Sequence, residues 1–388
     1  MTETCDVVVI GAGIAGASTA YHLRAEHGLS VRLIERGAVA SGGTGQSAAI
    51  IRQHYSNALA AGLTRDSITL FDAMEQRHGR PTGVRRTGYR LLLGPDMLEG
   101  ARRNVAMIQG LGIDTEILDV AALDLPWLEP DGIAGVVWEP DGGYADPVRA
   151  TEAFVAAFQE AGGLLFTRTP VRTLLREGDR VFGVMTEAGS VHAGAVVNAA
   201  GPWAAPLAHQ AGIALPVSAV REQDTVWEAR SGRPLPDTPV SNGLEAIYLR
   251  PLGGRRFVVG RGFPKAYEPA DPYNYRTTAD EPFVFDVLAR LERRLPSFQG
   301  ATLVDSYAAL YDVTPDWYPF AGPRRDVAGY LDCNGGSGHG FKLGPALGRD
   351  LAAWIATGAP RTPDFARLSH DRIADGRVFT QAYGGNRG

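Results

Sequence analysis

Residues 5–16, CDVVVIGAGIAG, decide the fold class of this chain. They join a short, continuously apolar run, which is typical of a strand covered on both faces, to a glycine-rich turn. Gly11, Gly13 and Gly16 have the GxGxxG spacing, and helix-forming residues follow the turn. A second strand is expected over residues 31–36. The stretch therefore predicts a βαβ unit that binds a dinucleotide.

Each glycine of the turn has its own physical role. Gly11 allows the tight turn, Gly13 lets the backbone approach a pyrophosphate, and Gly16 lets the helix pack closely on the strand. The N-terminus of the helix, at Ile14 and Ala15, offers unpaired N–H groups and a partial positive charge. We expect the phosphates to bind there.

An acidic residue stands where this pattern requires one. Glu35, followed by Arg36, ends the second strand about 20 residues after the turn, where a carboxylate accepts hydrogen bonds from ribose hydroxyls. The same features occur in proteins that bind NAD and in proteins that bind FAD. The fingerprint alone leaves the choice of dinucleotide open.

A second glycine-rich turn comes late in the chain. Residues 333–348 read CNGGSGHGFKLGPALG, in which Gly335, Gly336, Gly338 and Gly340 surround His339 and precede Lys342. Apolar residues at helical spacing follow, so a helix is expected to begin at this turn. We expect Pro345 at the start of that helix, where its missing N–H group costs nothing.

Between the two turns, the chain alternates between α/β segments and segments rich in strands. Helices are expected near residues 57–78, 96–110, 147–161 and 280–293. Short strands are expected between them, and beyond Pro216 the chain again reads as β-rich. No internal repeat or long linker separates the blocks. The order of the elements predicts two interleaved domains rather than two consecutive ones.

The bulk composition excludes several classes of protein. The 388 residues carry a formal net charge of −5, whereas a nucleic-acid surface would need clustered excess Lys and Arg. No apolar run approaches the roughly 20 residues that span a bilayer. The two cysteines imply no disulfide framework, and no basic and apolar leader precedes the first strand. We therefore expect a soluble, cytoplasmic protein that binds no nucleic acid and no metal and is not inserted in a membrane.

Five motifs together resemble those of the D-amino-acid oxidase superfamily of flavoproteins, in the branch of sarcosine oxidase and its dimethylglycine and glycine oxidase relatives. Besides the N-terminal fingerprint, they are GSGHGFKLGPALG (336–348), LYDVTPDWYPFAG (310–322), SGGTGQSAAIIRQHY (41–55), DGGYADP (141–147) and VVNAAGPW (196–203). The resemblance extends over nearly the whole chain. It implies an α/β fold in which a Rossmann-type FAD-binding domain is interleaved with a β-rich (α+β) substrate-binding domain.

The resemblance also implies domain boundaries and a cofactor. Residues 1–85, 146–212 and 316–388 would form the FAD-binding domain, and residues 86–145 and 213–315 the substrate-binding domain. The late loop and its helix would lie beside the pyrimidine edge of the flavin, where N–H groups and the helix dipole stabilise negative charge on the reduced ring. The residues expected to bind FAD are Gly11, Gly13, Ile14, Ala15, Gly16, Glu35, Arg36, Gly43, Thr44, Gly45, Ser47, Val171, Ala200, Gly201, Trp203, Gly336, Gly338, His339, Gly340, Phe341 and Lys342.

The family's reaction removes a hydride equivalent from the carbon beside an amine nitrogen and leaves an imine that hydrolyses. The resemblance places the carboxylate of a small amine or amino-acid substrate against Arg52 and Lys342. Arginine supplies a planar, two-pronged donor, and lysine a compact point charge. Tyr248 matches the active-site tyrosine of the family, and Arg250 on the same expected strand is an alternative ligand of the carboxylate.

Three positions depart from the sarcosine oxidase pattern. The cysteine that holds flavin covalently in that enzyme is Ala309 here, so we expect non-covalent FAD. The lysine that activates oxygen aligns with Val258, and Lys265 lies nearby in sequence but off the motif. An arginine and a threonine of the family's pocket align with Ala49 and Ala48, so the substrate need not be sarcosine.

These observations favour oxidation of the C–N bond of a small, secondary or N-methylated amine or amino acid, with oxygen or another electron acceptor. Three alternatives stay open. The enzyme could deaminate a primary amino acid, as glycine and D-amino-acid oxidases do. The chain could be a flavin-binding subunit of a larger complex, or an NAD-dependent dehydrogenase. The sequence gives no oligomeric state.

Overall fold

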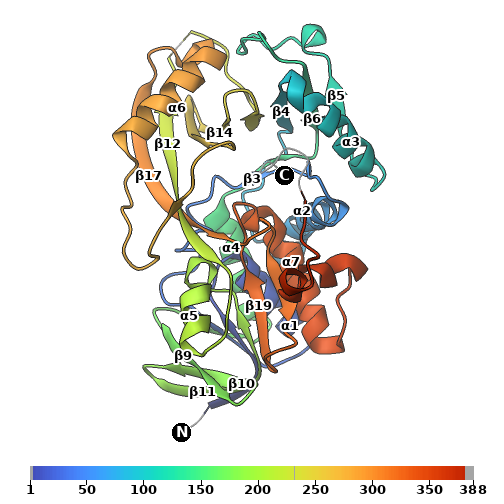
Figure 1. The fold of residues 1–388 in the computed structure, drawn as a ribbon, viewed down its shortest axis with the longest axis vertical. Coiled ribbons are helices and arrows are strands. Elements are labelled where there is room, and N and C mark those ends of the chain that lie inside the picture. The colour runs from blue at the N-terminus through green and yellow to red at the C-terminus, as the bar shows by residue number, and fades with distance from the viewer. Residues whose placement is uncertain (1–2, 231, 381–388) are drawn as a thin grey trace.

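The computed structural model describes residues 3–230 and 232–380 and contains two large sheets (Figure 1). The first sheet has eight strands, and its central part follows the order β18-β19-β11-β1-β2-β8, with β10 and β9 continuing from β11. The strands of this sheet are β1 (Glu3–Ile10), β2 (Val31–Ile34), β8 (Leu164–Phe166), β9 (Val171–Glu177), β10 (Arg180–Thr186), β11 (Gly189–Asn198), β18 (Phe320–Pro323) and β19 (Tyr330–Asn334).

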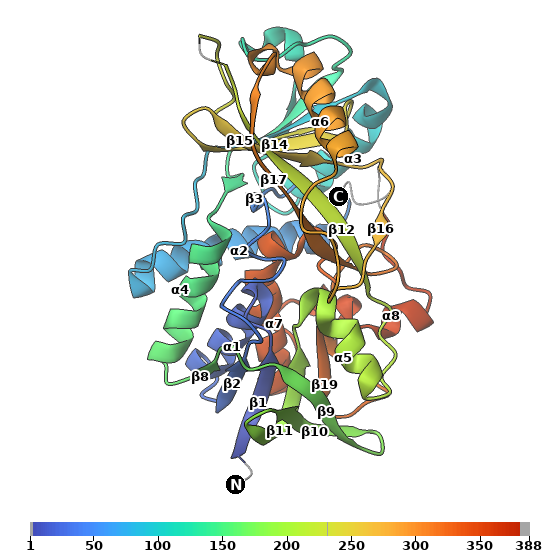
Figure 2. The same cartoon turned by 90° about the vertical axis from the view of Figure 1, so that its left-hand side faces the viewer.

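Both faces of this sheet are covered, as the apolar run at residues 7–10 predicts. Val7 and Val9 pack into the core beneath the helices, whereas Val8 and Ile10 pack into the core on the other side. This division follows from the two-residue period of a strand. Figure 2 shows α4 on one side of the sheet and α5 on the other. The helices of this half are α1 (Ile14–Ala25), α2 (Ala58–His78), α4 (Pro147–Glu160), α5 (Ala204–Gln210), α7 (Gly340–Thr357) and α8 (Asp371–Ala374).

The second sheet has nine strands and follows the order β16-β12-β15-β14-β13-β4-β6-β5, with β17 also paired to β12. Its pairings are antiparallel except for β13 with β4. The strands are β4 (Tyr89–Leu93), β5 (Glu116–Leu118), β6 (Gly135–Glu139), β12 (Ser218–Glu228), β13 (Val240–Asn242), β14 (Ile247–Gly253), β15 (Arg256–Arg261), β16 (Glu268–Pro269) and β17 (Thr302–Val313). Helices α3 (Leu98–Gln109) and α6 (Glu281–Arg294) belong to this half.

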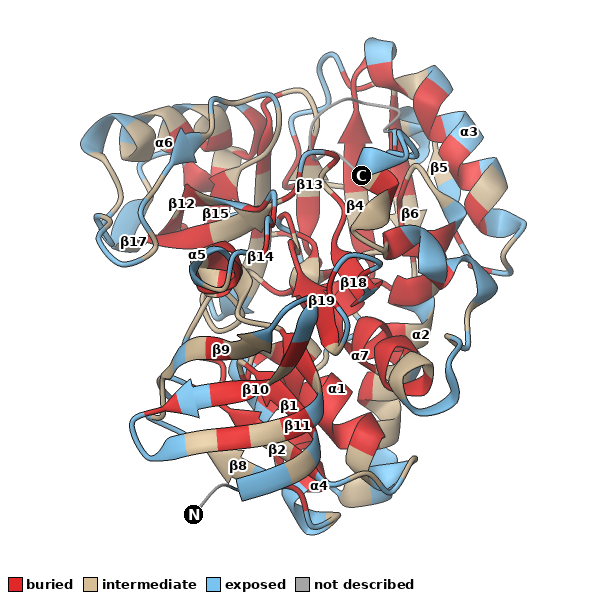
Figure 3. Cartoon of the chain, turned by 60° about the horizontal axis from the view of Figure 1, so that its bottom comes forward, coloured by how far each residue is buried: buried red, intermediate tan, exposed pale blue. Residues whose placement is uncertain are grey.

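Short elements lie between and around the two sheets. Strands β3 (Ile50–Ile51) and β7 (Gly143–Tyr144) pair with each other. Figure 1 shows β3 between the two halves. Five 3₁₀ turns are described, at Pro95–Met97, Val120–Ala122, Gly201–Trp203, Pro296–Phe298 and Pro363–Leu368. In Figure 3 the buried residues concentrate in the strands and in the helices that cover them. No helix within the described ranges is long and apolar enough to cross a membrane.

The interleaved α/β and β-rich architecture is the predicted one. Each sheet draws its strands from separate stretches of the chain, and the chain leaves and re-enters the first sheet around β4–β6 and again around β12–β17. The residue boundaries proposed for the two domains stay a prediction. They include residues 1–2, 231 and 381–388, which lie outside the described residues.

The start of the last long helix differs from the expectation. α7 begins at Gly340, so Pro345 lies inside the helix and not at its first turn. Proline cannot donate to the helix ladder, and two side chains from other helices bond to the backbone there. The Ser67 hydroxyl accepts from the Ala346 N–H group (3.1 Å), and the Ser18 hydroxyl donates to the Pro345 carbonyl (2.7 Å).

Candidate active site

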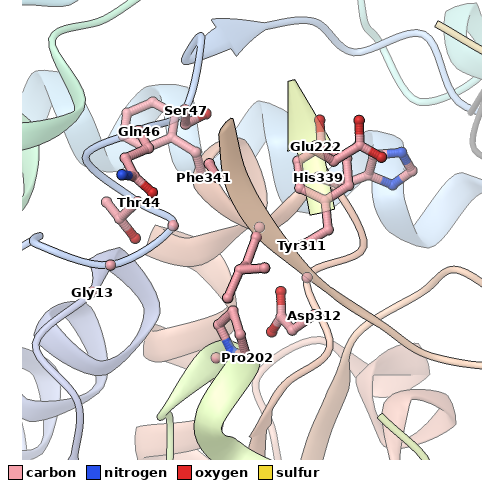
Figure 4. A pocket seen from close by; sticks show the side chains of 18 of the residues that line it. Gly13, Thr44, Gln46, Ser47, Pro202, Glu222, Tyr311, Asp312, His339 and Phe341 are labelled. Carbon is pink, nitrogen blue, oxygen red and sulfur yellow. The ribbon is translucent and has the colours of Figure 1, made fainter. Parts of the chain in front are cut away.

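A pocket of about 1150 Å³ extends from the glycine fingerprint to the strands of the second sheet. Gly13 and Thr44 lie at one end in Figure 4, whereas Glu222 and His339 lie at the other. Strand β17 passes between them and contributes Tyr311 to the lining. The residues that line the pocket come from both halves of the fold, as the binding of a dinucleotide and a separate substrate requires.

The first turn has the close packing that its glycines predicted. Gly11 has φ of +101°, and a Cβ atom there would lie 2.5 Å from the Ala199 carbonyl oxygen. A Cβ atom on Gly16 would lie 2.0 Å from the Gly11 carbonyl oxygen. Real Cβ atoms do not approach oxygen so closely, so the turn excludes side chains at both positions.

Glu35 holds this turn from within. One carboxylate oxygen accepts from the Ala12 N–H group (2.8 Å), and the other accepts from the Gly37 N–H group (2.7 Å). The side chain is buried but still lines the pocket. The structure thus gives Glu35 a role in shaping the turn that the sequence did not predict. Its expected contact with ribose hydroxyls stays a prediction.

The N-terminus of α1 faces the pocket without a side-chain cap of its own. Gly13 is the N-cap residue and makes no capping hydrogen bond. The Ile14 N–H group donates to the Thr44 hydroxyl at 3.3 Å. Thr44 belongs to the SGGTGQSAAIIRQHY segment (41–55). A helix N-terminus of this kind suits a phosphate group.

Most of the expected cofactor residues line this one pocket. They are Gly11, Gly13, Ile14, Ala15, Gly16, Glu35, Arg36, Gly43, Thr44, Ser47, Val171, Ala200, Gly201, Trp203, Gly336, Gly338, His339, Gly340, Phe341 and Lys342. The Arg36 guanidinium stacks over the Trp203 ring at 4.5 Å. The exception is Gly45, which does not line the pocket. Its N–H group donates to the Ala40 carbonyl (2.9 Å), so this glycine closes a turn within the loop.

The late loop brings a second uncapped helix N-terminus to the same pocket. α7 starts at Gly340, and its N-cap residue, His339, makes no capping hydrogen bond. Gly338 has φ of +79°, and a Cβ atom there would lie 2.7 Å from the Tyr311 ring. Two helix N-termini on one elongated cavity fit a molecule with a pyrophosphate at one end and a ring that gains negative charge at the other. The residues present therefore fit FAD.

Arg52 and Lys342 come together at the pocket from distant parts of the chain. Both line it, and the Lys342 side chain is 7% exposed. Burial, followed by the charge of Arg52, lowers the pKa of Lys342 well below its ordinary value. Among residues 3–230 and 232–380, neither cation has a carboxylate as an ion-pair partner. A guanidinium and an amine that line the same pocket, neither of them ion-paired with a carboxylate, favour an anion there.

The Arg52 guanidinium is held in place by local contacts. It lies over the Tyr55 ring at 4.6 Å and donates to the His54 carbonyl oxygen. It is the end of β3 that delivers the side chain to this position. A planar group that both stacks and donates cannot be reproduced by an ammonium group.

Glu139 lies behind Arg52 and is fully buried. One of its oxygens accepts from the Gln53 N–H group (2.8 Å), and the other has no hydrogen-bond partner among the described residues. Burial raises the pKa of Glu139 to about 7, although the Gln53 N–H group and the Arg52 charge act in the opposite direction. Sequence reasoning did not identify this residue, because a single glutamate at a strand end carries no distinctive pattern.

We expect Glu139→Gln to stabilise the protein at alkaline pH. The folded protein retains a proton on Glu139 that the unfolded chain loses above its ordinary pKa, so ionisation costs stability as pH rises from the unfolded value toward about 7. The cost reaches on the order of 3 kcal/mol above that range, and glutamine avoids it. Denaturant unfolding should show a larger gain for the variant at about pH 8 than at about pH 5. An equal difference at both pH values would contradict the shifted pKa.

Tyr248 and Arg250 lie on the same face of β14 but reach different places. Tyr248 lines the pocket, and its hydroxyl donates to the Asp224 carboxylate (2.8 Å). Arg250 does not line the pocket. Arg250 lies two residues further along β14 than Tyr248, and its guanidinium therefore lies over the Tyr144 ring, at 5.1 Å. The structure does not bring this alternative carboxylate ligand to the pocket.

The structure also shows where the three departures from the family pattern lie relative to the pocket. Ala309, Ala48 and Ala49 line the pocket, whereas Val258 is buried on β15 opposite Arg250, and neither of these two residues lines it. Lys265 forms an ion pair with Glu222, a pocket-lining carboxylate. The ammonium group of Lys265 lies 6.0 Å from the centre of the Tyr311 ring. Its positive charge therefore stands at the pocket wall, but with a counter-charge.

Sequence reasoning missed the two acidic residues that β12 contributes to the pocket, Glu222 and Asp224. They alternate with Gln223 and therefore share one face of the strand. The sequence does contain a pattern that indicates this strand, since Glu222 and Asp224 are two residues apart and are followed by Val226 and Trp227. The strand was not recognised because its charged residues interrupt the apolar alternation that usually marks a strand.

Comparison with known proteins gives the family. The chain matches the DAO model, described as FAD dependent oxidoreductase, over residues 6–354. It is 27% identical over 371 residues to 4-methylaminobutanoate oxidase (formaldehyde-forming) of Paenarthrobacter nicotinovorans, with 91% of this chain and 44% of that protein covered. It is 27% identical over 404 residues to sarcosine oxidase subunit beta of Arthrobacter sp, with 98% of this chain and 93% of that protein covered.

The solved structure of L-proline dehydrogenase from P. horikoshii has the same fold. Its TM-score is 0.88 at 26% identity, and the match covers 98% of this chain and 100% of that one. The chain spans less than half the length of the 4-methylaminobutanoate oxidase that it matches, and nearly the whole of the sarcosine oxidase subunit. The family model, by contrast, extends over most of this chain. The chain belongs to the DAO family of FAD-dependent oxidoreductases, which confirms the fold and the cofactor that its motifs predicted.

Proposed function

We propose that this protein oxidises the C–N bond of a small amino acid whose nitrogen is secondary or N-methylated. The observation that carries the proposal is that Arg52 and Lys342 lie together in the same pocket. Both cations line the cofactor pocket next to the N-terminus of α7, and neither has a carboxylate partner among the described residues. A substrate carboxylate is the anion that a family of this chemistry would supply.

FAD, when bound, accepts the hydride equivalent that leaves the carbon beside the nitrogen. The residues of the protein bind and orient. The two glycine turns would hold the ends of the cofactor, and Arg52 with Lys342 would fix the substrate carboxylate. Fixing one end of a small molecule places its reacting carbon, and such positioning accounts for much of the rate in reactions of this kind.

The relatives support the N-methylated class. One is named a formaldehyde-forming oxidase of 4-methylaminobutanoate, and another is a subunit of sarcosine oxidase. Formaldehyde is the product expected when the oxidised carbon is an N-methyl group, because the imine formed there hydrolyses to formaldehyde and the demethylated amine.

Product analysis tests this proposal. The purified protein, incubated with an N-methylated amino acid and an electron acceptor, is expected to release formaldehyde and the demethylated amino acid in equal amounts. Ammonia with a keto acid would instead indicate deamination of a primary amino acid. Turnover of neither class would leave the second candidate, a flavin-binding subunit that needs a partner. The subunit status of the sarcosine oxidase relative supports that candidate.

The flavin is expected to be released intact by acid. Ala309 offers no sulfur at the position where sarcosine oxidase attaches its flavin, and burial raises the pKa of the Cys333 thiol in the pocket to about 12, which keeps it unreactive. After precipitation with acid, the yellow colour should stay in the supernatant. Colour that remains with the protein pellet would identify another attachment residue.

We also expect the reduced protein to react slowly with oxygen. Val258 places no cation beside the flavin, and the charge of Lys265 is paired with Glu222. A positive charge near the flavin assists electron transfer to oxygen because the product is an anion. Stopped-flow mixing with aerated buffer should show slower reoxidation in the parent than in Glu222→Gln, which leaves Lys265 unpaired. Rapid reoxidation in the parent, unchanged by that substitution, would contradict this expectation.

A further inference from the structure

Three neighbouring strands of the second sheet bring one carboxylate and one phenol together across a glycine. Gly260 of β15 is paired with Asp224 of β12 on one side and with Tyr248 of β14 on the other. The Tyr248 hydroxyl reaches over Gly260 and donates to Asp224 Oδ1 at 2.8 Å. A Cβ atom on Gly260 would lie 2.3 Å from both of these oxygen atoms. The hydrogen bond therefore requires glycine at this position.

The carboxylate so held faces the pocket. Asp224, Tyr248 and Glu222 all line it, and Asp224 is 6% exposed. Glu222 is neutralised by its ion pair with Lys265. Asp224 forms no ion pair with any described residue, and the charges of Lys265 and Arg250 act on it only from beyond ion-pair distance. Burial raises the pKa of Asp224, and the Tyr248 hydrogen bond acts against that effect.

Several other charged and titratable groups among the described residues surround Asp224, and of these only Tyr248 is hydrogen-bonded to it. Burial also raises the pKa of Tyr248 well above its ordinary value, so the phenol stays protonated and remains a donor. The groups that face Asp224 are Glu222 on its own strand, Tyr248 and Arg250 on β14, Tyr307 and Tyr311 on β17, and Lys265 after β15.

We infer that Asp224, held by Tyr248 across Gly260, binds the cationic nitrogen of the substrate and receives its proton. The inference rests on the proposed function and narrows the substrate to a zwitterion. Arg52 and Lys342 would bind its carboxylate, and Asp224 its ammonium group. Tyr248 is a positioning residue in this arrangement, since it acts through the carboxylate.

The proton step follows from the chemistry of amines. The pKa of an alkylammonium group in water is about 10, so an amino acid enters the pocket with a protonated nitrogen. Loss of a hydride equivalent from the neighbouring carbon needs the nitrogen lone pair. The N–H bond therefore breaks first: its proton moves to an Asp224 oxygen, the electron pair stays on nitrogen, and the products are a neutral amine and a neutral carboxyl group.

Two probes of the same shape test the inference on the FAD-bound protein. Trimethylammonioacetate and 3,3-dimethylbutanoate both carry a carboxylate and three methyl groups, but only the first has a positive charge. Neither can be oxidised as a secondary amine. Their dissociation constants, measured from the perturbation of flavin absorbance, are expected to differ by about 10-fold or more in favour of the charged probe, as a buried charged contact implies.

Substitutions then locate the preference. Asp224→Asn is expected to reduce the ratio of the two dissociation constants to below about 3-fold, with 3,3-dimethylbutanoate binding little changed. Glu228→Gln is the matched control, because Glu228 lies on the same strand but is exposed and outside the pocket. Tyr248→Phe should keep much of the preference, because the Asp224 charge remains. Gly260→Ala should reduce it, because a methyl group displaces both oxygens.

The parent protein gives a test without any substitution. At low pH a protonated Asp224 carries no charge, so the ratio of the two dissociation constants should fall toward one, whereas it should stay flat in Asp224→Asn. Each dissociation constant is first corrected for the fraction of probe whose carboxyl group is ionised, because 3,3-dimethylbutanoate takes up a proton at higher pH than trimethylammonioacetate does. The corrected ratio cancels effects of pH on the carboxylate clamp, since both probes share it. Equal binding of the two probes at every pH would overturn the inference.

The outcomes separate this inference from the proposed function. If the parent binds both probes equally while an N-methylated amino acid still bleaches the flavin, the role of Asp224 is wrong and the function stands. If Glu222→Gln abolishes the preference and Asp224→Asn does not, the role of Asp224 is also wrong. If neither probe perturbs the flavin and no amino acid bleaches it, the proposed function fails, and the inference fails with it.

Discussion

Replacing Lys342 by methionine is expected to weaken the binding of a simple carboxylate such as acetate by about 10- to 150-fold, while the flavin stays bound. Lys342 is buried in the pocket wall beside Arg52, so the loss of its charge removes one charged hydrogen bond, which is worth about 1.5–3 kcal/mol. Titration of flavin absorbance with acetate measures the change. Methionine has a similar length and no charge, so it fills the same space.

The pH dependence of this binding gives a second readout. The pKa of Lys342 is lowered well below its ordinary value by burial and then by the charge of Arg52. An anion favours the protonated lysine, so acetate should bind more weakly as pH rises through the pKa of Lys342 in the free protein. Ionisation of Glu139, with its pKa of about 7, acts in the same direction. Lys342→Met should lose the lysine part of this dependence.

Arg52→Lys tests the other half of the clamp. Lysine cannot reproduce the stacking on Tyr55 together with the donation to the His54 carbonyl, so this variant should be nearly as impaired as Arg52→Ala. Arg256→Gln is the control, since Arg256 is exposed at the start of β15. If both clamp variants bind acetate as tightly as the parent, the pocket holds its substrate by another group.

The second large effect concerns the first glycine turn. Gly16→Ala is expected to abolish stable FAD binding and to lower stability by about 1–3 kcal/mol or more, because the new Cβ atom would lie 2.0 Å from the Gly11 carbonyl oxygen. The obstacle is backbone, so no side-chain rotation relieves it. The flavin content of the purified protein and its thermal unfolding measure both parts of the effect.

Gly62→Ala is the matched control for this substitution. Gly62 lies inside α2, and a Cβ atom there would meet nothing within 4 Å. Alanine is the better helix former by about 1 kcal/mol, so this variant should be as stable as the parent or more stable, with full flavin content. A flavin-loaded, stable Gly16→Ala protein would contradict the packing described for the turn.

The fold was predictable because its strongest local signals fall at both ends of the FAD-binding half. The apolar run before Gly11 and the glycine turn before α7 each combine a strand, a turn and a helix, and such combinations rarely arise by chance. The two longest strands of the second sheet, β12 and β17, were not delimited. β12 carries buried charged residues, among them Arg221 and Glu222, so it lacks the apolar alternation that marks a strand.

The site was predictable where motifs carry it and not where tertiary contacts decide. Lys342 and Arg52 follow glycine loops that fix their positions, and both reach the pocket. Whether Arg250 reaches the pocket depends on its position along β14, which no local sequence pattern gives. Its guanidinium lies over the Tyr144 ring instead. Asp224 owes its place to a glycine 36 residues away on the neighbouring strand, a pairing that only the folded sheet reveals.

Anaerobic titration of the yellow protein with a panel of N-methylated amino acids tests the central claim most directly. We expect at least one of them to bleach the flavin absorbance, and the same compound at the same concentration to bleach Lys342→Met at least about 10-fold more slowly, as the loss of one charged hydrogen bond implies. A matching amine without the carboxylate should bleach the parent poorly. Bleaching by amines regardless of a carboxylate, or no bleaching by any member of the panel, would contradict the account.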